Sequence, residues 1–225
     1  MLFDAVGTLI HPTPNVATAY ASVGRRLGSR LTEDEIRSRF QAAFTRQEQL
    51  DRETLDHATS ETRERQRWQA IVAETLVDVT DHGAAFAQLW EHFARPEHWR
   101  LDDDAPTLLG ALQDQGCILG VASNFDARLT TICRALVPQF DPDRVFASSL
   151  VGWKKPSPRF FEAVAARLDA TPEQLMLVGD DLENDYRAAS AAGWQAVLVD
   201  RHGPSAERRS VTRLAEVALL VAPPT

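Results

Sequence analysis

The sequence predicts an α/β fold in which a Rossmann-like parallel sheet forms a three-layer α/β/α core, with a helical cap inserted into it. Three observations lead to this prediction. Short apolar runs of strand length alternate with helical stretches through the second half of the chain. A further apolar run opens the chain, and helix after helix follows it. The apolar runs are continuous and not alternating, which indicates strands buried on both faces and hence a parallel sheet between helices.

The first strand comes from the first ten or so residues. An apolar run leads into Asp4, and a Gly-Thr turn follows soon after. Because this strand belongs to the same sheet as the later strands, the helical stretch is an insertion and not a separate N-terminal domain. We therefore expect an α/β core from residues 1–11 and 99–225 and a helical cap from residues 12–98.

The predicted cap is rich in Ala, Arg, Glu and Gln and has no strand pattern. Thr32 followed by Glu35 is a capping-box signature that begins one helix. Apolar and aromatic residues recur at helical spacing around Trp68 and again around Phe86. Each of these stripes needs a partner face, so we expect a small helical bundle with its aromatic residues in the core. The charge run of residues 63–67 is expected to be a solvated helix face.

Beyond the cap, strands and helices alternate. The stretch from Asp126 to Leu136 reads as a helix, and Ser157 followed by proline begins another, with a cap residue before proline in the first turn. The runs predicted to be strands of the sheet are residues 117–122, 144–148, 175–179 and 195–199.

Composition narrows the classes of partner and the compartment. The formal net charge is −8, which disfavours nucleic acid or an anionic membrane as a main partner because both would repel an acidic surface. No run is apolar and long enough to cross a bilayer, and no leader pattern is present. Cys117 and Cys133 are the only cysteines, which suits reduced thiols. We expect a cytoplasmic protein; no pattern indicates its oligomeric state.

Polar side chains follow four of the predicted strands, where the carboxyl ends of parallel strands place reactive groups. Several carboxylates at one point repel one another unless a cation neutralises them, and hard oxygen ligands describe a Mg²⁺ site. A lysine would balance the remaining charge, a serine hydroxyl and backbone N–H groups would hold phosphoryl oxygens, and an aspartate could attack phosphorus. The residues concerned are Asp4, Ser123 with Asn124, Lys155, and the acidic turn of Asp180, Asp181 and Asp185.

These motifs, in this order, resemble the haloacid dehalogenase superfamily of hydrolases, and within it the subgroup named haloacid dehalogenase-like hydrolase domain-containing protein 3. The superfamily has an aspartate at the tip of its first strand, then a Ser or Thr, a Lys and an acidic pair, with a helical cap inserted after the first motif. The matching stretches are residues 3–9, 122–126, 152–159 and 179–185, and the cap segment around Arg67 and Trp68.

The resemblance implies a role for each matching residue and a small phosphorylated metabolite or other small anion as the ligand. Asp4 would be the nucleophile and Lys155 a catalytic residue, while Ser123 and Asn124 would bind substrate. Lys154 would be exposed, because the superfamily's spacing assigns the site to the lysine before proline. Mg²⁺ would be held by Asp4, the backbone carbonyl of Val6 and Asp180, with support from Thr8, Asp181 and Asp185.

Val6 departs from the pattern of the superfamily's phosphatases. They place a second aspartate two residues after the nucleophile, as general acid for the leaving group and general base for the attacking water. Losing such a group typically costs about 10²–10⁴ in rate. We therefore expect a phosphohydrolase that is slow or restricted to good leaving groups. His11, in the entry loop, could stand in as the base, but it lies in a proline-flanked loop and we expect it to be exposed instead.

Two alternatives remain open. Metal-independent 2-haloacid dehalogenases of the superfamily also lack the second aspartate, since halide leaves without a proton, but they replace the acidic turn with serine and asparagine. The acidic cluster here argues against that activity, because it would repel a carboxylate substrate. The other alternative is a non-catalytic protein that binds a phosphorylated ligand or a protein partner. Val6 favours it, and the retained nucleophile, lysine and acids argue against it.

Overall fold

The computed structural model describes residues 1–201, 203 and 209–221 of the chain. Its main feature is a six-stranded sheet in the order β5-β4-β1-β6-β7-β8, in which every neighbouring pair of strands is parallel. The strands are β1 Leu2–Phe3, β4 Gly120–Ser123, β5 Val145–Ala147, β6 Met176–Gly179, β7 Gln195–Val199 and β8 Ser210–Val211.

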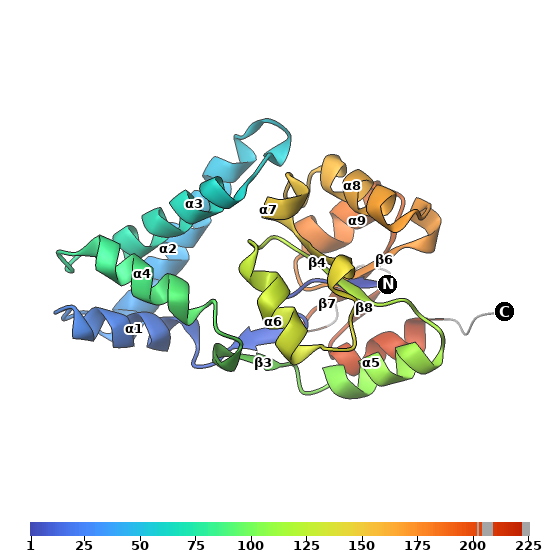
Figure 1. The fold of residues 1–225 in the computed structure, drawn as a ribbon, viewed down its shortest axis with the longest axis horizontal. Helices are drawn as coiled ribbons and strands as arrows, with labels where there is room; N and C mark the ends of the chain where they lie inside the picture. The colour runs from blue at the N-terminus through green and yellow to red at the C-terminus, as the bar shows by residue number, and fades with distance from the viewer. Residues whose placement is uncertain (202, 204–208, 222–225) are drawn as a thin grey trace.

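Both faces of this sheet are covered by helices, as the continuous apolar runs predict (Figure 1). In β1, Leu2 packs into the core on one face and Phe3 into the core on the other. Helices α5 and α6 cover the Phe3 face, and α7, α8 and α9 cover the Leu2 face. The three-layer α/β/α core is therefore confirmed. Its helices are α5 Ala105–Asp114, α6 Arg128–Leu136, α7 Ser148–Val151, α8 Pro158–Leu168 and α9 Ala188–Ala191.

The first strand is shorter than the ten residues predicted. The backbone turns at Gly7, whose φ is 96°, and the N–H groups of Leu9 and Ile10 both donate to the carbonyl of Ala5 at 2.9 Å. The chain therefore leaves the sheet directly after Asp4. The chain then forms a second strand, β2, Ile10–Pro12. This strand pairs antiparallel with β3, Trp99–Leu101, in a separate two-stranded ribbon.

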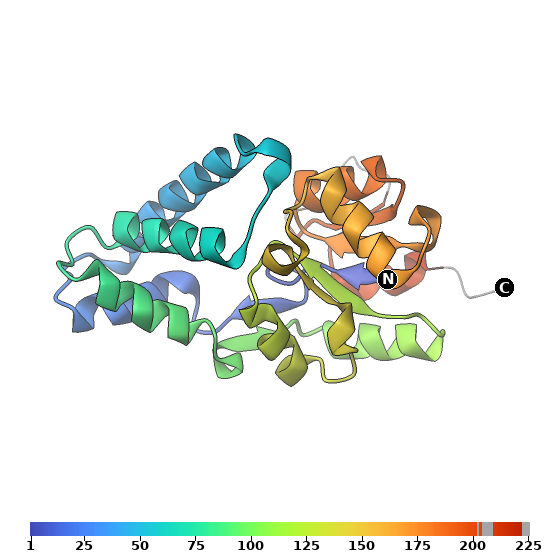
Figure 2. The same cartoon turned by 45° about the horizontal axis from the view of Figure 1, so that its top comes forward.

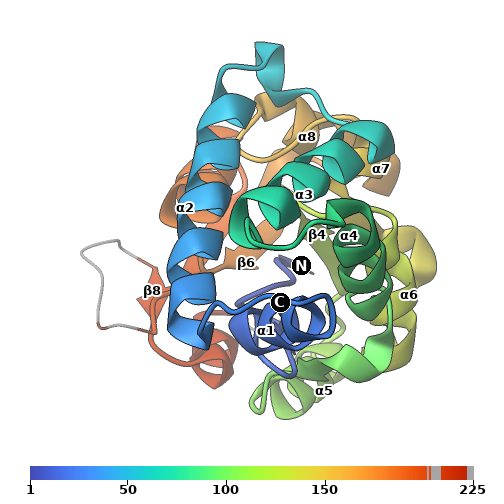
Figure 3. The ribbon, with the colours of Figure 1, turned by 90° about the vertical axis from the view of Figure 1, so that its left-hand side faces the viewer.

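Four long helices stand beside the core and connect to it through that ribbon (Figures 1 and 2). In Figure 3 they lie in front of one edge of the core. The ribbon lies at the predicted boundaries of the cap. That residues 12–98 form a separate cap unit stays a prediction. The helices are α1 Val16–Arg26, α2 Glu33–Arg52, α3 Glu61–Thr75 and α4 His82–His92.

The interior of this helical group is an apolar cluster that draws on all four helices, including Tyr20, Ile36, Val72 and Phe86. The capping box of Thr32 and Glu35 at the start of α2 is present with both of its reciprocal hydrogen bonds. Helix α4 begins instead at an aspartate whose side chain accepts a backbone N–H. The packing of these helices thus follows their apolar stripes.

Short helical turns complete the fold, and none of the helices in the described residues combines the length and apolar character needed to cross a bilayer. One of them, Leu182–Arg187, is a π-helical turn that follows the acidic motif after β6. The others are 3-10 turns at Leu55–His57, Pro96–His98, Pro142–Arg144, Pro172–Gln174 and Leu214–Leu220.

Candidate active site

Asp4 lies at the carboxyl end of the central strand of the sheet. Its backbone N–H donates to the carbonyl of Val178 at 2.8 Å, which continues the pairing of β1 with β6 by one residue. Since β4 and β6 flank β1, their last residues end at the same edge. Ser123 from β4 and Asp180 after β6 therefore line one cavity with Asp4.

Lys155 reaches this edge from the loop before α8 and is fully enclosed. Its Nζ donates to Asp4 Oδ1 at 2.8 Å, to Asp185 Oδ1 at 2.5 Å and to the carbonyl of Ala122 at 2.8 Å. Burial alone would lower the pKa of Lys155, but the carboxylates of Asp185 and Asp4 outweigh it and raise that pKa above its usual range. Lys155 is therefore a permanent cation whose three N–H bonds are all used.

Asn124 holds the backbone of that lysine in place. Its Nδ2 donates to the carbonyl of Lys155 and its Oδ1 accepts the Lys155 N–H, both at 2.8 Å. The sequence predicts a substrate contact for Asn124; the structure shows its amide engaged on both sides by the Lys155 peptide. Ser123 is buried at the end of β4 and lines the cavity.

The two consecutive aspartates of the acidic turn after β6 make different contacts. Asp180 accepts a hydrogen bond from the Thr8 hydroxyl at 3.0 Å, and a Cβ on Gly7 would lie 2.3 Å from Asp180 Oδ2. Glycine at that position, in a left-handed conformation, therefore makes room for the carboxylate. Asp181 instead caps the π-helical turn and accepts the N–H groups of Glu183 and Asn184.

Three carboxylates meet at one point of the site. Asp4, Asp180 and Asp185 each offer an oxygen, and these oxygens lie within 4.8 Å of one another. Burial raises the pKa of Asp185 to about 7, with a further contribution from the Asp4 charge that Lys155 only partly offsets. Loss of hydration in the cavity and the Asp4 carboxylate also raise the pKa of Asp180, although its side chain is exposed on one side to solvent.

The balance of charge at this point indicates whether a metal ion would fit there. One ammonium, that of Lys155, faces three carboxylates, and the Asp4 charge adds to burial in raising the pKa of Asp180 and Asp185. The donors are all hard oxygens, which Mg²⁺ prefers. The residues present therefore fit a divalent cation, with Asp4 and Asp180 as ligands. Asp185 already bonds Lys155 at 2.5 Å and the Asp181 N–H at 3.1 Å, so it orients the lysine.

Neither Val6 nor His11 places an acid–base group beside Asp4. The Val6 side chain is 38% exposed and lines the cavity beside Asp4. His11 is not exposed as predicted: it lies in the β2–β3 ribbon, where its Nε2 is 2.9 Å from Asp102 Oδ2. It is not among the residues that line the cavity. The position two residues after Asp4 is therefore apolar.

The cavity extends from Asp4 into the helical group and has a volume of about 380 Å³. We predicted the aromatic residues of this group to be core, and Tyr20 and Phe86 are indeed buried. Both also line the cavity, together with Trp68 and Trp90, which are only half-buried. The helical periodicity shows that such residues face inward, but it does not distinguish a packed core from a cavity wall.

Lys154, expected to be exposed, is only 4% exposed, and its ammonium pairs with acids of the helical group and not with Asp4. Its Nζ lies 2.5 Å from Asp51 of α2 and 3.5 Å from Glu64 of α3. Arg67 joins the same carboxylates, with 3.1 Å to Asp51. The charge run of residues 63–67 is therefore not a solvated face throughout, because Glu64 and Arg67 are buried, Glu64 beside Lys154 and Arg67 beside Asp51.

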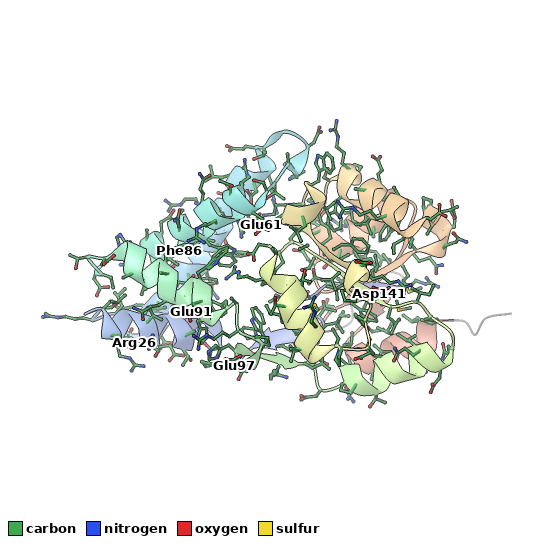
Figure 4. The ribbon with its side chains drawn as sticks, viewed as in Figure 1. Arg26, Glu61, Phe86, Glu91, Glu97 and Asp141 are labelled. Carbon is green, nitrogen blue, oxygen red and sulfur yellow. The ribbon has the colours of Figure 1, made fainter. Side chains whose placement is uncertain are left out.

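Backbone contacts add to this junction between the helical group and the loop that carries both lysines. The Thr59 N–H donates to the Gly152 carbonyl, and the Lys154 N–H donates to the His57 carbonyl, both at 3.0 Å. Glu61, which Figure 4 shows at the end of α3 nearest the core, accepts from the Ala127 N–H at 2.9 Å and from the Ser149 hydroxyl. The helical group is thus joined by hydrogen bonds to the core beside Lys155.

Comparison with known proteins agrees with the family resemblance of the motifs. The family model described as "Hydrolase: haloacid dehalogenase-like hydrolase" matches residues 1–193. The human haloacid dehalogenase-like hydrolase domain-containing protein 3 is 30% identical over 205 residues, which cover 88% of this chain and 80% of that protein. A ribulose-1,5-bisphosphate 5-phosphatase from Halopiger xanaduensis is 34% identical over 123 residues, 53% of this chain and 50% of that protein.

Solved structures share the fold. A HAD phosphatase from Thermococcus onnurineus superimposes with a TM-score of 0.69 at 23% identity, covering 99% of this chain and 97% of that one. The defluorinating L-2-haloacid dehalogenase Rha0230 gives 0.74 at 19% identity, covering 97% of this chain and 93% of that one. The fold therefore hosts both activities, and the family match together with its phosphatase relatives makes this chain a hydrolase. The protein belongs to the haloacid dehalogenase-like hydrolase family, alongside the domain-containing protein 3 subgroup.

Proposed function

We propose that the protein is a Mg²⁺-dependent phosphohydrolase that works through an aspartyl-phosphate on Asp4. The observation that carries this proposal is the charge surplus at the carboxyl edge of the sheet, where three carboxylates face one lysine. A divalent cation and a phosphate dianion neutralise such a set together. A substrate that brought only a negative charge, without a metal, would be repelled by it.

The residues then have distinct tasks in the reaction. Lys155 holds Asp4 Oδ1 at 2.8 Å, which leaves Oδ2 as the oxygen that attacks phosphorus. Ser123, at the end of β4, binds a phosphoryl oxygen, and Asn124 keeps the Lys155 loop in register. When bound by Asp4, Asp180 and the Val6 carbonyl, Mg²⁺ supplies charge stabilisation for the phosphoryl group. Thr8 orients Asp180, Asp181 caps the turn that follows, and Asp185 orients Lys155.

Val6 limits the leaving groups that this site can expel. No side chain at that position can protonate a departing alkoxide, so a leaving group that is stable as an anion is favoured. Water then attacks phosphorus and releases Asp4, again without a base at residue 6. We therefore expect slow turnover overall, with aryl and acyl phosphates ahead of alkyl phosphates.

The biological setting follows from the same features. We propose a small phosphorylated metabolite as the substrate, residues 12–98 as a cap that gates access to it, and a cytoplasmic location. Cys117 and Cys133 are both free, which is compatible with a reducing compartment.

The test is a phosphatase screen with and without Mg²⁺ on wild type, Asp4→Asn and Val6→Asp, using aryl, acyl and alkyl phosphates. Asp4→Asn should abolish turnover, while Asp103→Asn, a change at a fully exposed acid, should leave it unchanged. Val6→Asp should raise the rate on alkyl phosphates by about 10²-fold or more. Chloride release from a 2-chloroacid without metal would instead favour a dehalogenase. Inactivity of all variants, Val6→Asp included, would favour a non-catalytic binding role.

A further inference from the structure

The cavity above Asp4 has two chemically different ends. At the core end lie the carboxylates, Lys155 and Ser123. At the other end the wall is aromatic and aliphatic and comes mainly from the four helices of the cap, with Phe86 visible inside this group in Figure 4. The aromatic residues of the wall are Tyr20, Phe40, Phe44, Trp68, Phe86, Trp90, Phe93, Trp99 and Phe125.

The cations that line the apolar end are already neutralised by the protein. Arg128 donates to both carboxylate oxygens of Asp126 at 2.7 Å, and its guanidinium lies 3.6 Å from the ring centroid of Trp90. Arg67 pairs with Asp51 of α2, and Lys154 pairs with Asp51 and with Glu64 of α3. In the described part of the wall, each of these three cations therefore has a carboxylate partner, and none is left over for a second phosphate or carboxylate of a ligand.

The size of the cavity fits one compact organic group beside the phosphate. Ligand pockets range from about 300 to 1,000 Å³, so about 380 Å³ lies at the small end. An engineered apolar cavity of about 150 Å³ holds benzene. The present cavity therefore has room for a phosphoryl group and a flat ring system of one or two rings.

We propose that the substrate is a phosphate monoester of an aromatic alcohol, with its ring in the aromatic end of the cavity and its phosphate at Asp4. This inference rests on the proposed phosphohydrolase function and names its substrate class. Flat rings pack against aromatic walls through stacked or edge-to-face contacts. A sugar would find few partners for its hydroxyl groups in such a wall, and leaving them unpaired is costly.

The aryl group also fits the chemistry that Val6 imposes. Asp4 Oδ2 forms a bond to phosphorus while the bond between phosphorus and the aryl oxygen breaks, and that electron pair leaves on the aryl oxygen. The ring delocalises the resulting anion, which takes a proton from water after it departs. A water oxygen then attacks phosphorus, Asp4 leaves as carboxylate, and the water proton passes to solvent. The net products are a phenol and inorganic phosphate, and no acid at residue 6 is needed.

Kinetics of the Mg²⁺-loaded protein with three substrates test the inference. The substrates are 2-naphthyl phosphate, phenyl phosphate and acetyl phosphate. The two aryl phosphates differ mainly in ring area, and acetyl phosphate has a good leaving group without a ring. We expect kcat/KM for 2-naphthyl phosphate to exceed that for phenyl phosphate by about tenfold, because the second ring buries more apolar surface. Phe40→Ala should reduce this ratio to about two and leave acetyl phosphate turnover within about threefold.

Matched variants separate loss of the wall from loss of the fold. Leu50→Ala lies on the same helix as Phe40, is 47% exposed and does not line the cavity, so it should leave the substrate ratio unchanged. Phe40→Leu keeps apolar volume but removes the ring, and it should give an intermediate ratio. A ratio that falls equally in Leu50→Ala and Phe40→Ala would overturn the inference.

A binding measurement distinguishes failure of the inference from failure of the proposed function. We expect 2-naphthylphosphonate, which cannot be hydrolysed, to bind the Mg²⁺-loaded protein at least about tenfold more tightly than methylphosphonate by calorimetry. That preference without turnover of any phosphate would support the aromatic site and reject the phosphohydrolase. Turnover of acetyl phosphate without that preference would reject the aromatic site alone. Neither preference nor turnover would overturn both.

Discussion

Two adjacent lysines enter two charge clusters that differ in the balance of cations and carboxylates. Lys155 enters the cluster at the carboxyl edge of the sheet, where one ammonium faces Asp4, Asp180 and Asp185. Lys154 turns toward the helical group. There Lys154, Arg63 and Arg67 face three carboxylates, those of Asp51, Glu48 and Glu64. We call the first the sheet-edge cluster and the second the junction cluster.

The difference between the clusters shows which one has its charge balanced by the protein's own residues and which one does not. In the junction cluster, burial by itself would raise the pKa of Asp51, but Lys154, Arg67 and Arg63 together lower it, so the ionised form stabilises the fold. In the sheet-edge cluster the pKa of Asp180 is raised, so its ionised form destabilises the metal-free fold. The junction cluster is neutralised by its own residues and joins two parts of the structure, whereas the surplus charge of the sheet-edge cluster supports the proposed cation site.

Removing divalent ions gives the largest expected effect. Chelation should lower turnover by at least about 10³-fold, because a bound metal supplies several kcal/mol of charge stabilisation in the transition state. Added Mg²⁺ should restore turnover and raise the unfolding free energy by about 2.7 kcal/mol at 100 times its Kd. Denaturant titrations of wild type and Asp180→Asn measure the second effect. An equal stabilisation by Mg²⁺ in both proteins would contradict a metal site at the sheet edge.

Neutralising one acid in each cluster should change stability in opposite directions. Asp51→Asn should lower the unfolding free energy of the metal-free protein by about 3 kcal/mol, since it leaves buried cations short of a partner. Asp180→Asn should raise it slightly, by less than about 1 kcal/mol, since it relieves repulsion at a site that solvent reaches. Urea denaturation in the presence of chelator measures both. Losses of the same size in the two variants would show that the clusters are alike.

The affinity for Mg²⁺ should rise with pH. The folded pKa of the proposed ligand Asp180 is raised, and that of its neighbour Asp185 is raised to about 7, so protons bound at low pH remove negative charge that the metal needs. Each proton released on binding changes the affinity by about tenfold per pH unit. Calorimetry in buffers of different ionisation enthalpy counts those protons. In the metal-free protein, the stability that these protons contribute is present below the ordinary carboxyl pKa and is lost as the pH rises through the raised values.

Two threonines give the smallest and most closely matched comparison. Thr8 donates to Asp180 at 3.0 Å in the sheet-edge cluster, and Thr59 donates to Glu64 at 2.9 Å in the junction cluster. Each hydrogen bond to a carboxylate is worth about 1.5 kcal/mol. Thr8→Val should therefore weaken Mg²⁺ binding by about tenfold. Thr59→Val should lower the unfolding free energy by about 1.5 kcal/mol and leave the Mg²⁺ affinity unchanged. Weaker Mg²⁺ binding in Thr59→Val would contradict the separation of the two clusters.

The sequence alone determined the parallel sheet and the set of polar residues at its carboxyl edge. Buried strands leave continuous apolar runs, and parallel connections bring the residues after those runs to one edge, so local pattern and topology suffice. Asp4, Ser123 and Asp180 could be grouped for this reason. The start of α2 was equally predictable, because a capping box is contained within four consecutive residues.

Only the tertiary structure decided the direction of Lys154, the burial of Glu64 and Arg67, and the cavity among the aromatic residues. The carboxylate and cation partners of the junction cluster come from α2, α3 and the loop before α8, more than 100 residues apart for Asp51 and Lys154. Helical periodicity specifies which face of a helix is covered, but not which residues cover it or how completely they fill the space. Charge pairing and cavity shape arise between elements, and they exist only once those elements have packed.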